Sequence, residues 1–198
     1  MRPSKTLFAA ILLLGSLPGC GYNRIQELDE RAEQQRSNIE VELVNRNNLI
    51  PNLVATVEGA ADFERGTFTE VARARAGLEQ AQGAVSSAVE NGDVADLSEA
   101  DAAVTRQIGT YLNIAVEAYP QLQATASFQA LQDQLAESEN RISVARRDYN
   151  QAVQEYNTYI RRFPQVVTAR ATGAERREPF EAPAGAEETP TVDFGSDG

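Results

Sequence analysis

The chain has 198 residues, no His or Trp, a single Cys and a net charge of −11. These features exclude a His-based catalytic triad, zinc sites built from His or Cys clusters, and a disulfide within the chain. The acidic balance argues against nucleic-acid binding and against electrostatic adhesion to anionic lipid headgroups, because both need a positive surface.

Residues 1–19 have the pattern of a bacterial lipoprotein signal peptide. Two positive charges precede the apolar run Thr6–Leu17, which is too short to span a bilayer but suits the hydrophobic core of a secretory signal. The run closes on Leu17-Pro18-Gly19-Cys20, which resembles a lipobox, with Pro18 departing from the usual small residue. In such signals the cysteine is lipidated and becomes the first residue of the mature chain. The alternative is an uncleaved signal anchor in which Cys20 is incidental.

Lipidation at Cys20 implies a location outside the cytoplasm. Gly21 follows the cysteine, not Asp. In a Gram-negative host we therefore expect a lipoprotein on the periplasmic face of the outer membrane.

The first expected helix runs over residues 23–61. Its apolar residues recur at intervals of three and four, with Arg46 as a polar interruption. Pro51 lies inside this pattern and removes a backbone donor, so the helix should kink or break near residues 47–50. The expected inward positions are Ile25, Leu28, Ala32, Ile39, Leu43, Ile50, Leu53, Val54 and Val57.

Two shorter helices are expected next. The segment Thr67-Phe68-Thr69-Glu70 has the spacing of a capping box and starts a helix that ends near Glu90. Asn91-Gly92-Asp93 predicts a turn. Ser98, with Asp101 three residues later, predicts the N-cap of a third helix that ends at Tyr119-Pro120.

A long fourth helix is expected over residues 127–163. Apolar residues recur every seven positions, and a second set lies three residues further on, with Ser138 as its polar member. Such a heptad repeat predicts left-handed packing against other long helices. The two sets are Phe128, Leu135, Ile142, Tyr149, Tyr156 and Phe163, and Leu131, Ser138, Ala145, Ala152 and Tyr159.

Four amphipathic segments without a strand pattern predict an all-α fold, an antiparallel four-helix bundle with long first and last helices. We place the signal peptide at 1–19, the bundle at 20–166 and a disordered acidic tail at 167–198, where Ala, Gly, Pro and Glu predominate. For the two apolar islands in this tail, Pro179-Phe180-Glu181 and Val192-Asp193-Phe194, one hypothesis is docking on the bundle or on a partner, and the other is solvation, which is the more frequent state of a lone Phe in a tail.

Several segments together resemble the LemA family. They are Tyr22-Asn23, residues 38–43 (NIEVEL), 48–54 (NLIPNLV), 118–122 (AYPQL), 128–131 (FQAL), 139–142 (ENRI), 148–150 (DYN), Tyr156-Asn157, Phe163-Pro164 and the two apolar islands of the tail. The resemblance covers about residues 22–194 and implies a four-helix bundle with a membrane-proximal first helix. It implies no established activity. One branch of the family belongs to bacterial membrane-compartment machinery, which points to membrane organisation.

Polar residues within these segments are the candidate site. They are Asn38, Asn48, Asn52, Glu139, Asn140, Arg141, Arg147, Asn150 and Asn157. One hypothesis is a shared polar interaction site between the first and fourth helices. The other is that these residues fix helix register or form ordinary ion pairs, as buried Asn does in coiled coils.

We expect a non-enzymatic scaffold or interaction protein of the cell envelope that is attached to the membrane by lipid and binds another envelope protein. The second hypothesis is a ligand- or cell-wall-binding module, and the third a hydrolase that uses carboxylates alone. No motif for a cofactor or metal such as a calcium-binding loop is present, so none is expected.

Overall fold

The computed structural model describes residues 19–61 and 68–181. Every regular element in these ranges is helical, which confirms the expected all-α class. None of the helices in the described ranges combines the length and the apolar character needed to cross a bilayer. Thr67 of the predicted capping box, and the apolar island at 192–194, lie outside the described residues.

The first two helices are α2 (Gly19–Asn47) and α3 (Ile50–Ala61). The predicted break is therefore confirmed, and it falls just before Pro51, which has no N–H to continue the helical ladder. The backbone N–H of Asn48 still donates to the carbonyl of Val44 at 3.0 Å, and that of Leu49 to Arg46 at 3.0 Å. All nine apolar positions predicted to face inward along residues 25–57 are buried.

Helices α4 (Phe68–Asn91) and α5 (Val94–Ala118) form a hairpin. Gly92 makes the tight turn with a φ of 71°, a value that glycine adopts without steric cost. The predicted N-cap at Ser98 was wrong, because Asp93 caps α5: its carboxylate accepts from the backbone N–H of Ala95 at 2.7 Å. Because Asp93 is a favoured N-cap residue and directly follows the turn, α5 begins at Val94. Ser98 therefore lies inside the helix, about one turn from its start.

A 3₁₀ turn, η1 (Pro120–Ala124), leads into the longest helix, α6 (Ala126–Arg161). Most of the predicted heptad positions are buried, including Ser138, while Tyr159 is half-buried. Phe163 was predicted wrongly: it is 83% exposed. Because α6 ends at Arg161, the seven-residue spacing no longer places residue 163 on the buried stripe.

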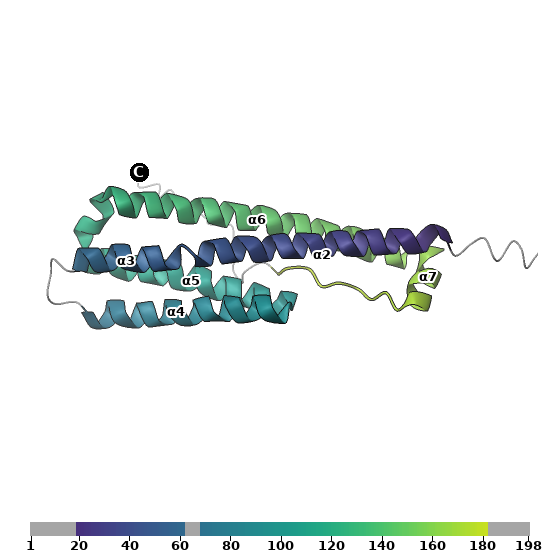
Figure 1. The fold of residues 1–198 in the computed structure, drawn as a ribbon, viewed down its shortest axis with the longest axis horizontal. Coiled ribbons are helices and arrows are strands. Elements are labelled where there is room, and N and C mark those ends of the chain that lie inside the picture. Colours follow the sequence, from purple (N-terminus) through teal and green to yellow (C-terminus); the bar gives the residue numbers. More distant parts are fainter. Residues whose placement is uncertain (1–18, 62–67, 182–198) are drawn as a thin grey trace, which may run out of the picture. The chain divides into compact units, whose positions relative to one another are not determined.

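The chain divides into two compact units. Among the described residues, unit 1 contains 19–49 and 129–179, and therefore α2, most of α6 and α7 (Gln165–Thr172). Its helices α2 and α6 run in opposite directions: Ile25 and Leu28 near the start of α2 pack with Tyr156 and Ile160 near the end of α6 (Figure 1). Unit 2 contains the described residues 50–61, 68–128 and 180–181.

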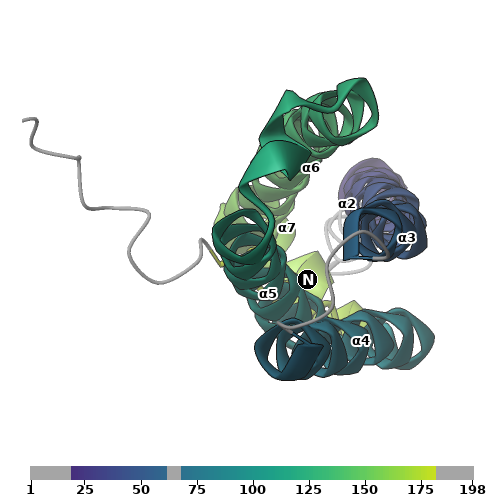
Figure 2. The same ribbon diagram turned by 90° about the vertical axis from the view of Figure 1, so that its left-hand side faces the viewer.

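In unit 2, α4 and α5 lie side by side in both views (Figures 1 and 2). Helix α3 is joined to α4 by an ion pair between Glu58 and Arg75. The core of this unit includes Leu53, Leu78 and Val104, each fully buried.

The region from residue 165 to 181 is structured, although the sequence predicts a disordered tail from 167. Gly173, in the left-handed conformation, caps the C-terminus of α7, and Ala169 of α7 is buried against α2 and α6. The following segment, 173–179, is not helical and runs back along unit 1, where Arg177 forms ion pairs with α2. We call residues 173–179 the strap. Phe180 is only 3% exposed, so this island is not solvated but docks on the folded chain, where burial of the aromatic ring is favourable.

Candidate functional site

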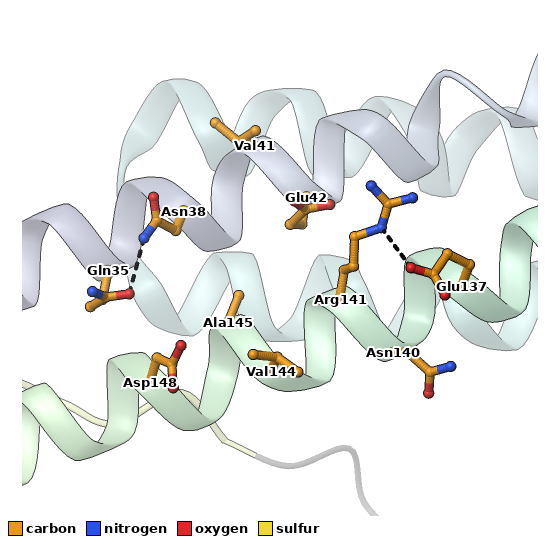
Figure 3. Close-up of a pocket in the computed structure, with 10 residues that line it drawn as sticks. All are labelled: Gln35, Asn38, Val41, Glu42, Glu137, Asn140, Arg141, Val144, Ala145 and Asp148. Carbon is orange, nitrogen blue, oxygen red and sulfur yellow. Dashed lines mark hydrogen bonds and ion pairs between the residues drawn. The ribbon is translucent and has the colours of Figure 1, made fainter.

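An open groove lies between α2 and α6 in unit 1 (Figure 3). Its volume is about 440 Å³, and its lining residues are Gln35, Asn38, Val41 and Glu42 of α2, and Glu137, Asn140, Arg141, Val144, Ala145 and Asp148 of α6. Three of the predicted polar residues, Asn38, Asn140 and Arg141, are therefore on this groove.

The groove combines apolar and acidic side chains. Val41 is 55% exposed and Val144 46% exposed, although both would gain from burial. Arg141 extends from α6 toward α2, and its Nε lies 3.4 Å from Glu137 Oε1. With Glu42, Glu137 and Asp148 against one Arg, the lining is net acidic. The amide of Asn38 donates to Gln35 Oε1 at 3.0 Å.

An ion pair between a buried arginine and a partly exposed glutamate lies between the same two helices. Arg46 has a side chain that is only 2% exposed, and its Nη1 donates to Glu139 Oε2 at 3.0 Å. Arg146 approaches the other carboxylate oxygen at 3.6 Å. Glu139 therefore balances the positive charge on a buried arginine, which is the structural hypothesis for this residue. The pairing of Arg46 with Glu139 was not predicted, although the interruption of an apolar stripe by Arg46 was a signal of it.

Asn157 holds the strap. Its Nδ2 donates to the carbonyl of Arg177 at 2.8 Å, and its Oδ1 accepts from the backbone N–H of Arg177 at 3.0 Å. Tyr149 Oη donates to the carbonyl of Glu178 at 2.8 Å. One amide side chain thus pairs with both backbone groups of one residue, as a neighbouring strand would.

The Arg177 side chain continues from this contact into an acidic site on α2. Its guanidinium binds Asp29 at 2.7 Å and Glu33 at 2.9 Å. These hydrogen bonds raise the pKa of Arg177, and the one to Asp29 has the largest effect. Hydrogen bonds from Arg36 and from Arg177 hold the pKa of Glu33 below its ordinary value, and the one from Arg36 has the larger effect. None of these contacts was predicted, because the sequence offers no pattern that pairs residue 177 with residues 29 and 33.

The remaining candidates lie apart from these contacts. Arg147 is exposed and its Nε donates to the carbonyl of Ser143 at 3.3 Å, and Asn150 is half-buried. Asn48 is exposed at the break after α2. Asn52 belongs to unit 2 and is also exposed. Seven of the nine predicted residues therefore divide among the groove, the ion pair with Arg46, the strap contact and the helix break, whereas Arg147 and Asn150 belong to none of these.

Comparison with known proteins decides the family. The profile of the LemA family matches residues 35–194, which is most of the chain. This chain belongs to the LemA family. Within the family it resembles two proteins of Paramagnetospirillum magneticum strain AMB-1, magnetosome proteins MamQ 1 and MamQ 2. Each is 32% identical over 206 residues, with 96% of this chain and 72% of the relative covered.

A third LemA-family relative is magnetosome protein MamQ of Magnetospirillum gryphiswaldense strain MSR-1. It is 30% identical over 188 residues, covering 86% of this chain and 68% of the relative.

Among the described residues, no group of three acidic or thiol side chains is placed to hold a metal ion. The arrangement in unit 1 is thus one of ion pairs and an open groove. Its chemistry suits recognition of a partner surface.

Proposed function

We propose that this LemA-family protein is a membrane-attached interaction protein of the cell envelope, without catalytic activity, whose groove between α2 and α6 binds a helix of another protein. The observation that carries the proposal is the exposure of Val41 and Val144 on a net acidic groove. A partner helix with an apolar ridge and flanking basic side chains complements both properties.

Membrane attachment is proposed to come from a lipid on Cys20, which would place the helical units outside the cytoplasm. It is supported by the apolar run Thr6–Leu17 and the lipobox-like Leu17–Cys20. The relatives' names place them in magnetosomes, and the family resemblance implies membrane organisation. In a Gram-negative host we propose the periplasmic face of the outer membrane.

We also propose that units 1 and 2 combine into one antiparallel four-helix bundle. The heptad spacing of α6 supports this, since such a stripe fits other long helices. Small-angle X-ray scattering tests it: one elongated rod is expected, whereas a profile of two separate bodies would contradict the bundle.

Site-specific photo-crosslinking in intact envelopes tests the groove. A photoreactive phenylalanine analogue at Val144 should give a defined protein adduct, because this side chain is exposed within the groove. The same analogue at Ser143, which is exposed on α6 outside the groove, is the matched control. The Val144 adduct should weaken when Glu42 and Asp148 are replaced by Gln and Asn.

Two outcomes would contradict the protein-binding function. One is equal labelling from residues 143 and 144, and the other is an adduct that is indifferent to the two acidic residues. A ligand- or cell-wall-binding function is favoured by the amides of Gln35, Asn38 and Asn140 on the groove. It would replace the proposal if no protein adduct forms and a cell-wall glycan raises the melting temperature of the wild type but not of an Asn38→Ala/Asn140→Ala variant.

A further inference from the structure

One end of unit 1 carries exposed apolar and positively charged side chains together. This end is formed by the start of α2, the end of α6 and helix α7 (Figure 1). Gly21 of α2 faces Gln165 and Thr168, close enough that an added Cβ would lie 3.6 Å from Gln165 Cγ. We call the following six residues the basic tip: Tyr22, Arg161, Arg162, Phe163, Val167 and Arg170.

The apolar members of the basic tip are unusually exposed. Phe163 is 83% exposed, Val167 61% and Tyr22 44%. They come from three different segments, but the contact of α7 with α2 brings those segments to one place. Exposed aromatic and aliphatic groups gathered in this way mark a surface that contacts another phase or molecule.

The charge of the α6 and α7 part of this end is opposite to that of the whole protein. Residues 156–174 contain three Arg and no Asp or Glu, although the net charge of the chain is −11. Of the acidic residues in the adjoining segments, Glu27 binds Arg24 at 2.6 Å and Glu155 binds Arg31 at 2.9 Å, and Glu175 follows directly after this range. Arg161, Arg162 and Arg170 are exposed. The acidic composition therefore does not exclude local attraction to anions.

The position of the basic tip in the chain identifies what it meets. The apolar run Thr6–Leu17 and Cys20 directly precede or begin α2, so attachment at either brings this end to the bilayer. Aromatic side chains prefer the interface between headgroups and acyl chains, and Arg extends its charge to the phosphates. Anionic lipid headgroups attract such clusters of positive charge.

We propose that the basic tip docks on an anionic phospholipid surface, with Phe163 and Val167 in the interface and Arg161, Arg162 and Arg170 at the phosphates. This inference rests on the membrane attachment in the proposed function. It adds a second contact, made by the folded unit itself, that would hold α2 and α6 in a fixed orientation to the bilayer.

The absence of Trp from the chain allows a direct test with the full-length protein. Phe163→Trp is reconstituted into vesicles of phosphatidylglycerol and phosphatidylcholine with brominated acyl chains. Docking should quench the Trp emission about twofold or more relative to unbrominated vesicles and shift it to shorter wavelength. Val144→Trp, more than about 25 Å away along α6, is the matched control and should remain unquenched.

The charge requirement is tested in the Phe163→Trp background. Arg161→Gln/Arg162→Gln, or vesicles of phosphatidylcholine alone, should abolish most of the quenching. Arg73→Gln/Arg106→Gln removes two exposed arginines from α4 and α5 and should leave it unchanged.

The outcomes separate this inference from the function on which it rests. If the protein co-floats with vesicles but residue 163 is not quenched, the docking of the basic tip is wrong and membrane attachment stands. If the quenching is equally strong with neutral vesicles and the arginine variants do not change it, the proposal that the basic tip docks on an anionic surface is wrong. If the protein does not co-float, membrane attachment itself fails.

Discussion

At the scale of single residues, polar groups of unit 1 are paired across helices. Arg46 is buried with Glu139 as a partner, and Arg177 lies between Asp29 and Glu33. A buried arginine costs desolvation energy unless its charge is compensated, so the effect of a substitution depends on which partner is removed.

Glu139→Ala should destabilise the protein by about 1.5–3 kcal/mol, because it leaves the charge of Arg46 with less compensation in the interior. Arg46→Met/Glu139→Ala should be less destabilised than Glu139→Ala alone, since the uncompensated charge is gone. Urea unfolding followed by circular dichroism measures both. Glu137→Ala, an exposed ion-pair partner of Arg141 on the same helix, is the control and should change stability by less than about 0.5 kcal/mol. A double variant less stable than Glu139→Ala would contradict this account.

Glu33 should make stability sensitive to acid. Arg36 and then Arg177 lower its pKa in the folded state, so its contribution is complete above the ordinary pKa of Glu, about 4.3. The contribution is lost as the pH falls through the lower folded value. In the Glu33→Gln variant, the free energy of unfolding should therefore fall less steeply as the pH drops below about 5. Glu30→Gln, at an exposed position of α2, is the comparison, and equal acid slopes in the two variants would disprove the role of Glu33.

At the scale of elements, the strap is the feature that sequence patterns did not reveal. Periodicity predicted the helices because an amphipathic stripe has a regular spacing. The strap has no periodicity, and its position depends on Asn157, Tyr149 and the acidic groups of α2, which are distant in sequence. The Ala-, Gly-, Pro- and Glu-rich composition of the longer region that contains it, residues 167–198, therefore predicted disorder.

Asn157→Ala should release the strap, because it removes two hydrogen bonds to the backbone of Arg177. A loss of about 1.4 kcal/mol would raise the open population, and with it the rate of tryptic cleavage after Arg176, roughly tenfold. Asn140→Ala, an exposed amide on the same helix, should leave the cleavage rate unchanged. Equal rates in the Asn157→Ala variant and the wild type would show that the strap is held by other contacts.

At the scale of the whole molecule, the net charge of −11 conceals an uneven distribution. The groove is net acidic, whereas the basic tip carries three exposed arginines next to the start of α2. A lipid on Cys20 would place that end at the membrane and leave the groove along the side of α2 and α6 open to a partner.

Cys20→Ala should release the protein from membranes or leave an unprocessed precursor, because the thiol is the site of lipid attachment in the proposal. Mass spectrometry and extraction of membranes with carbonate and detergent measure both. Asn23→Ala, exposed in the same helix, is the control and should retain the lipid mass. An unchanged mass together with unchanged membrane extraction in Cys20→Ala would disprove lipidation.

The sequence by itself determined the helical class, the break before Pro51, the LemA resemblance and most of the buried stripe, because these depend on local spacing and on backbone chemistry. Only the tertiary structure decided that Arg46 is paired with Glu139, that Asn157 holds the strap, and that Phe163 is exposed at the end of unit 1 where α7 contacts α2. Each of these facts depends on which distant segments meet. The spacing of residues along one helix carries no information about such meetings, so the surfaces proposed here for a partner and for a membrane became visible only in the folded chain.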